Sequence, residues 1–518
     1  MAHWLNFSDA VRLNAARSPD KEALADASRC FTWREVDQRA DRLANAILAM
    51  GLVKGDKVAI LLENCIEIIE LFIATARTGT IAVPINFRLV ADEVRYVTDN
   101  SDAKAFFVHD LFLDSLEPVR ARLGKIPAEN FVLVGPGKQA GYRGYEFVLS
   151  AMPPIFPEVK VEPGDTWIML YTSGTTGVPK GVVRSHESYT AFYLINAIDF
   201  AFSEADVCLN VMPLCHVNST YFTLNVMYVG GKVFVHPASG FDAAEVLRII
   251  VREKITFISF VPTHYRMLLA TGDKGRSGQD FSALKKLLCS SAPATLQMKR
   301  EIMEFFSGVD LYEGYGSTEA GIVTVLKPHE QFTKPGSIGR ESTGTSRIKI
   351  LDEHRQPVAE GKIGELYSRG PMLFDEYYKM PDVTANSFAG EWFTARDMAR
   401  RDEDGYYFLV DRKDNMIITG GEKVFPSEVE TVLLGHPAVY DAAVIGVADE
   451  KWGEVVTAVV ILKDDAVATE EELVAFCRGK VATFKRPKRA IFITADEMPR
   501  TPTGKILHRQ LRVRFGRG

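Results

Sequence analysis

The sequence predicts an α/β protein in which a large N-terminal domain of doubly wound sheets precedes a small α+β domain at the C-terminus. Expected strands and helices alternate with short connections over residues 32–108, which is typical of a parallel sheet covered by helices. Helix-capping patterns and apolar strand patterns resume beyond about residue 415, after a short charged run. The chain has 518 residues, 47% of them hydrophobic, which is enough to build more than one core.

The N-terminal alternation begins with a well-marked helix. Thr32 and Glu35 have the spacing of a capping box, and apolar residues recur behind them at helical spacing, which predicts a helix from Thr32 to about Met50. The elements expected next are a strand over 57–62, a helix ending near residue 79, a strand over 80–83, a helix around 92–97 and a strand over 103–108. This half of the chain carries no chemical motif, and we interpret it as scaffold.

Charge and hydropathy exclude several classes of protein. The 61 basic and 67 acidic residues give a net charge of −6, and no basic face is present to neutralise phosphates, so we expect no nucleic-acid partner. The first residues lack the basic and apolar regions of a secretory signal. Charged residues interrupt the most apolar region, residues 58–87, so we expect no integral membrane segment and a cytoplasmic location.

The six cysteines are scattered, without a C-x-x-C pair, which is typical of buried thiols in a reducing compartment. Cys215 stands beside His216, and such a pair can ligate a metal or act as a nucleophile. No second pair of ligands accompanies it, so we disfavour both roles.

The most informative stretch is Tyr171-Thr-Ser-Gly-Thr-Thr-Gly-Val-Pro-Lys-Gly181. It reads as a loop between two strands in which glycines, hydroxyls and free N–H groups form a concave surface of donors, and Lys180 adds a charge. That surface suits a polyphosphate. A Walker-type phosphate loop is disfavoured, because Val178 and Pro179 separate the second glycine from the lysine. An ordinary surface turn is the alternative for this stretch alone.

A second motif, Tyr312-Glu-Gly-Tyr-Gly-Ser-Thr-Glu319, combines an aromatic residue with possible phosphate and metal ligands. Its glycines would let the Tyr315 ring lie flat against a base, and Thr318 and Glu319 offer a hydroxyl and a carboxylate to phosphate and Mg²⁺. The small residues of 290–293, which follow the apolar residues 287–289, would allow a close approach of a ligand.

Two further strands are expected to end at polar residues. Val211-Met-Pro-Leu-Cys-His216 reads as an apolar strand that ends in an imidazole, and Ile255–Pro262 reads as a buried strand that leads into Thr263. A lone histidine at such a position is often structural, so His216 by itself permits both a structural and a functional interpretation.

The C-terminal part contains several short signals. Asp404-Gly405 predicts a hairpin that leads into the charged run at residues 411–415, where exposed residues with few packing constraints are expected. Ser427–Glu430 and Thr469–Glu472 have the pattern of capping boxes, and strands are expected over 442–447 and 455–462. The basic cluster at residues 484–488 reads as a solvated face or as a contact for phosphates.

Together these motifs resemble those of the adenylate-forming superfamily, which includes acyl-CoA synthetases, adenylation domains of peptide synthetases and luciferases. The resemblance runs from about Phe31 to Leu511 and includes five motifs in family order. The chain departs from the family pattern at Cys215, where an aromatic residue is usual, at Ser290-Ser291, which replace glycines, and at Ala395-Arg396. The nearest branch contains the AMP-forming CoA ligases of fatty and aromatic acids.

The resemblance implies roles for individual residues. The catalytic residues would be Lys505, Glu319 and Thr318, with Glu319 as the Mg²⁺ ligand. The ATP phosphates would be bound by Thr172, Ser173, Gly174, Thr175, Thr176, Gly177 and Lys180. Adenine and ribose would be bound by Ser291, Ala292, Pro293, Glu313, Gly314, Tyr315, Gly316, Asp397 and Arg412. The acyl pocket would be lined by His216, Asn218, Thr263 and Gly314, and the CoA channel by Gly420, Gly421 and Glu422.

The resemblance also implies a mobile C-terminal domain and a reaction in two steps. The expected domains are residues 1–411 for nucleotide and acyl binding, a hinge at 412–414 centred on Asp414, and a mobile domain over 415–518. A carboxylate would attack the α-phosphate of ATP and release pyrophosphate, forming an acyl-adenylate, while Mg²⁺ and Lys505 offset the charge that develops. Rotation about Asp414 would then withdraw Lys505 and bring the Gly420-Gly421 loop to the acyl-adenylate, which coenzyme A would attack.

The thiol acceptor and the acid are less closely defined by the motifs. CoA is favoured because the chain stops soon after Lys505, whereas a ligase that loads a carrier protein is the first alternative. The favoured substrate is a medium- or long-chain fatty acid, with aromatic, alicyclic and crotonobetaine/carnitine-type acids as alternatives. An inactive nucleotide-binding regulator is a distant alternative function. For the oligomeric state, both a monomer and a homodimer are compatible with the sequence.

Overall fold

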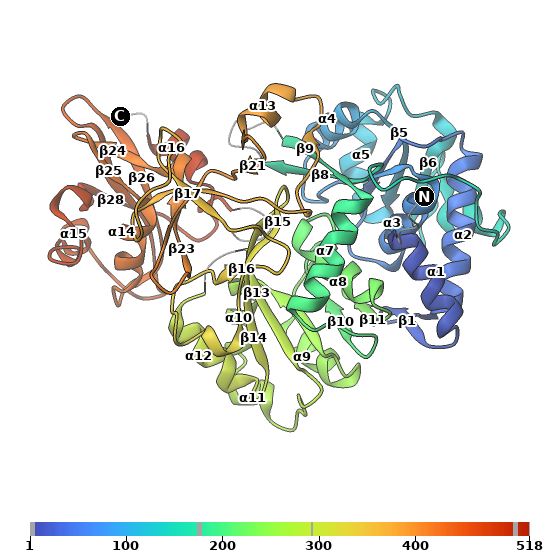
Figure 1. Ribbon diagram of the computed structural model, residues 1–518, viewed down its shortest axis with the longest axis horizontal. Helices are drawn as coiled ribbons and strands as arrows, with labels where there is room; N and C mark the ends of the chain where they lie inside the picture. The colour runs from blue at the N-terminus through green and yellow to red at the C-terminus, as the bar shows by residue number, and fades with distance from the viewer. Residues whose placement is uncertain (1–5, 174–178, 292–293, 501–505, 517–518) are drawn as a thin grey trace. The chain divides into compact units, whose positions relative to one another are not determined.

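The computed structural model describes residues 6–173, 179–291, 294–500 and 506–516 (Figure 1). The chain divides into two compact units, one formed by Met1–Arg347 with Ser368–Phe393 and the other by Ile348–Tyr367 with Thr394–Gly518. Residues 348–367 and 394–411, which the expected boundaries assign to the N-terminal domain, thus share a unit with the C-terminal residues. The boundaries 1–411, 412–414 and 415–518 stay a prediction.

An eight-stranded sheet of the first unit has the strand order β19-β9-β8-β4-β3-β5-β6-β7. Its strands are β3 (Lys57–Leu61), β4 (Ile81–Pro84), β5 (Ala103–His109), β6 (Phe131–Val134), β7 (Arg143–Gly144), β8 (Thr166–Ser173), β9 (Pro179–Ser185) and β19 (Glu376–Tyr377). The strands from β4 to β7 in this order run parallel, as the alternation predicts. Strand β9 is antiparallel to both of its neighbours, β8 and β19.

A nine-stranded sheet, of order β16-β15-β14-β13-β12-β10-β11-β1-β2, completes the framework of this unit. Its strands are β1 (Glu22–Ala25), β2 (Cys30–Thr32), β10 (Val207–Asn210), β11 (Lys232–Val235), β12 (Phe257–Phe260), β13 (Lys286–Ser290), β14 (Asp310–Ser317), β15 (Gly321–Leu326) and β16 (Arg340–Glu341). The five central strands, β11, β10, β12, β13 and β14, are parallel. Their carboxyl ends therefore lie along one edge of the sheet.

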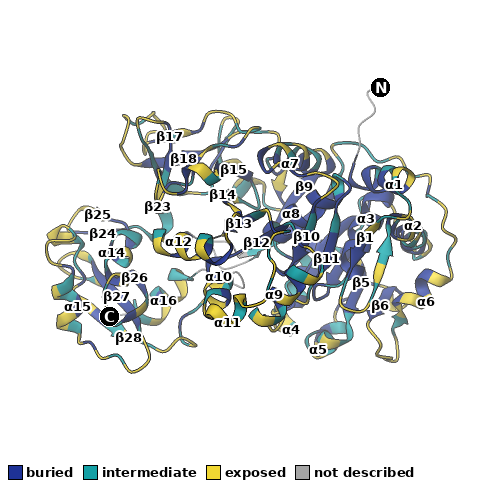
Figure 2. Ribbon diagram, turned by 90° about the horizontal axis from the view of Figure 1, so that it is seen from below, coloured by how far each residue is buried: buried dark blue, intermediate teal, exposed yellow. Residues whose placement is uncertain are grey.

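Helices cover both faces of both sheets (Figure 2). The helices between the sheets are α1 (Phe7–Arg17), α2 (Trp33–Ala49), α3 (Ile66–Thr78), α7 (His186–Asp199) and α8 (Val217–Tyr228). The outer helices are α4 (Ala91–Ser101) and α5 (Leu113–Arg120) on the eight-stranded sheet, and α9 (Ala243–Arg252), α10 (Pro262–Leu269) and α12 (Leu296–Phe305) on the nine-stranded sheet. Burial alternates with period two, since Val58 and Ile60 enter the central core and Ala59 and Leu61 an outer one.

The second unit contains two sheets. The four-stranded sheet consists of β17 (Lys349–Leu351), β18 (Gly364–Tyr367), β22 (Asp397–Arg401) and β23 (Tyr407–Arg412). The five-stranded sheet consists of β24 (Ile417–Thr419), β25 (Glu422–Val424), β26 (Val439–Asp449), β27 (Gly453–Leu462) and β28 (Arg489–Phe492), with α14 (Pro426–Leu434), α15 (Glu470–Phe476) and α16 (His508–Phe515). The hairpin predicted at Asp404-Gly405 is confirmed between β22 and β23, with Gly405 at a φ of 86°.

Several helix ends that the sequence predicts are found in the structure. The capping boxes at Thr32 and Thr469 are both formed, and Gly79 ends α3 in the left-handed conformation. The box predicted at Ser427–Glu430 is wrong, because Pro426 takes the first helical position and the Ser427 hydroxyl instead donates to the Val410 carbonyl. The Glu430 carboxylate accepts from Val444 N at 2.8 Å.

Two expectations about composition are also tested. The cysteines are unpaired, but Cys30 is exposed and Cys65 half-buried, so the expectation that all six are buried is wrong. Burial raises the pKa of the Cys215 thiol to about 12, which leaves it uncharged near neutrality. Through the described part of the chain, every helix is too short or too polar to cross a bilayer.

Candidate active site

Predicted site residues of the first unit gather at the carboxyl edge of the nine-stranded sheet. Ser290 ends β13 and lies opposite Gly314 of β14 in the parallel register, and Cys289 lies opposite Glu313. Helix α8, which follows β10, carries Asn218. Ligands of open α/β sheets bind in the crevice outside this edge, so the position agrees with a nucleotide or acyl site.

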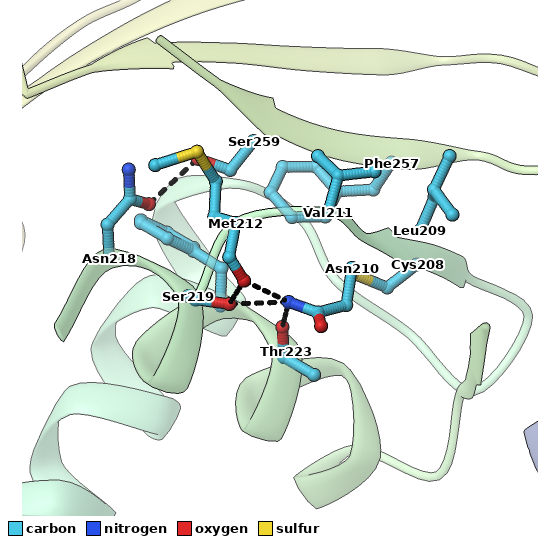
Figure 3. Close-up of a pocket in the computed structure, with 11 residues that line it drawn as sticks. Cys208, Leu209, Asn210, Val211, Met212, Asn218, Ser219, Thr223, Phe257 and Ser259 are labelled. Atoms are coloured by element: carbon cyan, nitrogen blue, oxygen red, sulfur yellow. Dashed lines mark hydrogen bonds between the residues drawn. The ribbon is translucent and has the colours of Figure 1, made fainter. Parts of the chain in front are cut away.

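The buried Asn218 amide joins three elements at this edge. Its Oδ1 accepts a hydrogen bond from the Ser259 hydroxyl of β12 at 2.8 Å (Figure 3). Its Nδ2 donates to the hydroxyls of Ser290 at 2.6 Å and Ser291 at 3.3 Å. Ser291 adopts a φ of 66°, which turns the chain out of β13. Asn218 thus holds the strand end from which the expected base-binding turn starts.

A small cavity adjoins this network (Figure 3). It is lined by Cys208, Leu209, Asn210, Val211, Met212, Asn218, Ser219, Phe222, Thr223, Phe257 and Ser259. The Asn210 amide donates to Met212 O and Thr223 Oγ1, each at 3.1 Å. The Nδ2 of Asn210 therefore has its hydrogen-bond acceptors among the residues that line the cavity. Cys208, Leu209, Val211, Met212, Phe222 and Phe257 form the apolar part of the lining.

Glu313, predicted to bind adenine, has partners within the protein. Its carboxylate forms an ion pair with Lys299 of α12 and accepts from Ala294 N at 3.4 Å. Burial raises the pKa of Glu313, and the Lys299 ammonium opposes that shift. Glu313 of β14 thus contacts both Ala294 and the α12 residue Lys299.

Tyr315 and Gly316 form a bulge in the β14–β15 ladder. A Cβ on Gly316 would lie 2.0 Å from the Gly321 carbonyl oxygen, so only glycine fits there. Tyr315 lies half-buried beside it. The bulge shifts the register by one residue, and two further pairs follow before the turn that carries Thr318 and Glu319.

Glu319 is held from both its backbone and its side chain. Its carbonyl oxygen accepts from Phe374 N at 2.7 Å, and its Oε1 accepts from the Tyr377 hydroxyl at 2.8 Å. Tyr377 was missed by sequence reasoning, because it belongs to no local motif. Strand β19 brings it to the site by pairing Tyr377 with Val182 of β9.

Lys180 reaches the same tyrosine. Its Nζ lies 4.9 Å from the centre of the Tyr377 ring, and in the β8–β9 ladder Lys180 lies opposite Thr172. The two strands expected on either side of the loop are confirmed as an antiparallel pair that includes residues 171–173 and 179–181, and residues 174–178 lie outside the described part of the chain. One cluster thus joins Thr172 and Lys180, predicted to bind phosphate, with Glu319, predicted to bind the metal.

His216 lies at the N-cap of α8, and the strand before it ends at Asn210. The prediction of a strand over 211–216 is therefore wrong, because the Asn64 amide, which binds the Met212 carbonyl and the Leu214 N–H, holds a turn there. Burial lowers the pKa of His216 to about 4, and the nearby Arg88 charge adds to the shift. The ring is neutral at neutral pH.

His264 has a similar environment on α10, next to the exposed Thr263. Its ring stacks on Phe241, with centroids 4.5 Å apart, and burial lowers its pKa to about 4, again with a contribution from Arg88. His264 Nδ1 and His216 Nε2 are both buried, and neither has a hydrogen-bond partner among the described residues.

In the second unit the hairpin brings Asp397 and Arg412 together. They are register partners in the β22–β23 ladder, and Arg412 Nε lies 3.4 Å from Asp397 Oδ1. The Arg412 guanidinium also donates to Ala395 O at 2.6 Å. Two residues predicted to bind ribose are therefore adjacent, although 15 positions separate them in the sequence.

The predicted hinge and CoA loop follow β23 in the same unit. Asp414 is half-buried and its carboxylate pairs with Arg396 at 2.7 Å, so the expectation of exposed residues with few constraints is wrong here. Gly420 and Gly421 have φ values of 57° and 83° and lead into β25 at the exposed Glu422. The hinge role of Asp414 itself stays a prediction.

Some predicted residues lie outside the described part of the chain. They are Gly174, Thr175, Thr176 and Gly177 of the phosphate loop, Ala292 and Pro293 of the base-binding turn, and Lys505. The strand position of Ser173 is described, but its side chain is not. Among the described residues no group of three or more His, Cys, Asp or Glu side chains could hold a metal.

The chain is similar to known AMP-binding enzymes over nearly its whole length. The model of the AMP-binding enzyme family matches residues 11–378, and that of the AMP-binding enzyme C-terminal domain matches residues 428–505. A feruloyl-CoA synthase from an Amycolatopsis species is 33% identical over 506 residues, covering 97% of each chain. The long-chain-fatty-acid–CoA ligase FadD13 of Mycobacterium tuberculosis is 31% identical over 520 residues, covering 98% of each chain.

Solved structures share the same fold. The anthranilate CoA ligase AuaEII in complex with anthranoyl-AMP gives a TM-score of 0.89 at 29% identity, covering 100% of this chain and 98% of that one. ATP-bound MatB from Rhodopseudomonas palustris gives 0.88 at 28% identity, covering 99% of each chain. The chain therefore belongs to the AMP-binding enzyme family, and it is an acid–thiol ligase of the AMP-forming acyl-CoA synthetase class.

Proposed function

We propose that the protein activates an aryl carboxylic acid that carries a hydrogen-bonding substituent, forming its acyl-adenylate from ATP and passing the acyl group to CoA. The observation that carries this choice is the pair of unpaired ring nitrogens, His216 Nε2 and His264 Nδ1. A buried polar atom without a partner costs about 1–3 kcal/mol, so a substrate with a hydroxyl or carbonyl group is favoured over a plain alkyl chain. The stacked Phe241 and His264 rings suit a flat substrate.

A medium- or long-chain fatty acid, the substrate favoured by the motifs, is the second candidate. FadD13 is named a long-chain-fatty-acid–CoA ligase, and ScoC of Streptomyces coeruleorubidus, 32% identical over 510 residues, is named a fatty acid–[acyl-carrier-protein] ligase. Both names support an aliphatic acid as the alternative.

The residues at the β14–β15 turn fit a magnesium ion bound together with ATP. Mg²⁺ prefers hard oxygen ligands and is commonly held by one or two carboxylates together with substrate phosphates, which a single carboxylate such as Glu319 can satisfy. Bound there with the hydroxyl of Thr318 nearby in sequence, the ion would offset phosphate charge. The Tyr377 hydroxyl, donating to Oε1, would keep the Glu319 carboxylate oriented.

The other roles follow from chemistry. Lys180, Thr172 and Ser173, with the residues of the loop between them, would bind the phosphates as cation and hydrogen-bond donors. Tyr315, between Gly314 and Gly316, would lie against adenine. The Asp397 carboxylate would accept both ribose hydroxyls, and Arg412 would add a contact to ribose or phosphate. Lys505 would stabilise the charge that develops between carboxylate and phosphate.

Coenzyme A is the proposed acceptor, and the second unit offers a surface that suits it. Trp452 is 43% exposed, and the ammonium groups of Lys451 and Lys488 lie 5.0 and 6.0 Å from its ring centre. Trp452 also accepts a backbone hydrogen bond from Gly420 at 2.8 Å. An aromatic ring with two cations, joined to the expected thiol loop, suits a nucleotide that carries phosphates. A carrier-protein acceptor is the alternative.

The test is pyrophosphate release from ATP and Mg²⁺ with a panel of hydroxycinnamic, benzoic, indolic and fatty acids, each with and without CoA. The expected result is continuous release with a hydroxylated aryl acid only when CoA is present. Continuous release with fatty acids alone would favour the second candidate. A single turnover that CoA does not affect would indicate a carrier protein, and no release with any acid would indicate a nucleotide-binding regulator.

A further inference from the structure

Arg184 in β9 is a buried arginine that the reaction scheme above does not use. Its side chain is fully buried, and the carboxyl group with which it interacts electrostatically is that of Asp375, whose pKa the Arg184 charge lowers against the effect of burial. Burying a guanidinium is costly unless its donors are well used. Its surroundings should therefore show what it holds in place.

The guanidinium binds backbone carbonyls from two separate segments. Nη1 donates to Thr318 O at 2.8 Å and to the Tyr221 hydroxyl, and Nη2 donates to Met372 O. The Tyr221 hydroxyl in turn donates to Thr318 O at 3.3 Å. The guanidinium carbon also lies 5.0 and 5.2 Å from the ring centres of Tyr221 and Tyr189.

These two segments are the ones that define the position of Glu319. Thr318 precedes Glu319 in the β14–β15 turn. The chain after Met372 supplies Phe374 N to the Glu319 carbonyl and the Tyr377 hydroxyl to its carboxylate. One guanidinium therefore ties the turn that carries Glu319 to the segment that orients it.

We propose that Arg184 is a positioning residue that sets the orientation of Thr318 and Glu319 for Mg²⁺-bound ATP, an inference that rests on the metal role proposed for Glu319. A guanidinium suits this task because its planar fork reaches acceptors on both segments at once. A lysine has a single ammonium at this position and cannot span them. Because the side chain is fully buried and its donors bind Thr318 and Met372, we assign it a role through the turn and not a direct contact with ATP or the acid.

The test compares Arg184→Met with Arg77→Met, a matched removal of another fully buried arginine, which pairs with Asp37 and Asp41 between α2 and α3. Affinities for ATP with and without Mg²⁺ are measured by calorimetric titration in the absence of acid. Arg184→Met should weaken Mg²⁺-ATP binding about tenfold or more and change metal-free ATP binding little, since hydrogen bonds to charged groups have that effect. Arg77→Met should lower thermal stability without this selective loss.

Arg184→Lys serves as the second variant, in case Arg184→Met does not fold, and should show an intermediate, Mg²⁺-selective loss. A folded Arg184 variant that binds Mg²⁺-ATP as tightly as the wild type would overturn the inference. Equal weakening of both nucleotide forms in a folded Arg184 variant would overturn it as well. If the wild-type protein bound no Mg²⁺-ATP, the proposed function would fall together with the inference.

Discussion

The β14 bulge illustrates how a single residue can control the site. A methyl group on Gly316 would meet the Gly321 carbonyl oxygen at 2.0 Å, and both atoms belong to the backbone. Gly316→Ala should therefore displace the turn carrying Thr318 and Glu319, reducing acid-dependent ATP–pyrophosphate exchange by at least about tenfold and stability by about 1–3 kcal/mol. Gly124→Ala, where a Cβ meets nothing within 4 Å, is the control. Unchanged exchange in Gly316→Ala would contradict this role of the bulge.

Tyr377 offers a second test at the same scale. Tyr377→Phe removes the 2.8 Å hydrogen bond to Glu319 and keeps the ring beside Lys180. A hydrogen bond to a charged group contributes about 1.5–3 kcal/mol, so adenylation should fall about tenfold while the thermal unfolding temperature stays nearly constant. Tyr378→Phe, which removes a 2.8 Å bond to Asp102, is the matched control. Equal activity of the two variants would show that the Tyr377 hydroxyl does not orient Glu319.

At the scale of elements, the junction between β8, β9 and α7 should make the protein sensitive to acid. His186 opens α7, is 1% exposed, and stacks on Trp167 of β8 with ring centroids 5.5 Å apart. Burial lowers the pKa of His186 to about 3 in the folded state, whereas a histidine in the unfolded chain titrates near about 6.5. Below pH 6.5 the unfolded state therefore binds a proton that the folded state does not.

The free energy of unfolding should thus fall as the pH drops from about 6.5 toward 3, with no contribution from His186 above that window. His186→Phe keeps a stacking ring and should reduce the difference in stability between pH 7.5 and pH 5 by about 2 kcal/mol, measured by urea unfolding. His354→Gln, at a histidine whose side chain is 80% exposed, should leave the difference unchanged. An identical pH dependence in His186→Phe and wild type would refute the prediction.

The ends of helices and strands also show which features local sequence predicts correctly and which it does not. Thr32 with Glu35, Gly79 and Gly405 each specify an element end through their own backbone or side-chain chemistry, and each is found where the sequence predicts it. Residues 211–216 read as a strand because they are apolar. They form a turn instead, since the Asn64 amide, 150 positions from Leu214, binds their backbone. A local pattern contains no information about that partner.

At the scale of the whole molecule, the two half-reactions should separate by mutation. Lys505→Ala should abolish acyl-adenylate formation and leave transfer from supplied acyl-adenylate to CoA largely intact, because the proposed role of the lysine is to offset charge in the first step alone. Asp414→Pro should do the reverse by fixing φ at the proposed hinge. Pyrophosphate release and thioester formation are measured separately. Parallel loss of both activities in both variants would contradict the assignment of two conformations.

The sequence by itself determined the class of enzyme and the residues of its motifs, because glycines, hydroxyls and charges at fixed spacing carry the chemistry of phosphate binding locally. Only the tertiary structure decided how Glu319 is held. Its partner Tyr377 lies 58 positions away, and Arg184 lies 134 positions from the Thr318 carbonyl it binds. These contacts depend on strand pairing and core packing between remote segments, and no local spacing specifies which side chains meet there.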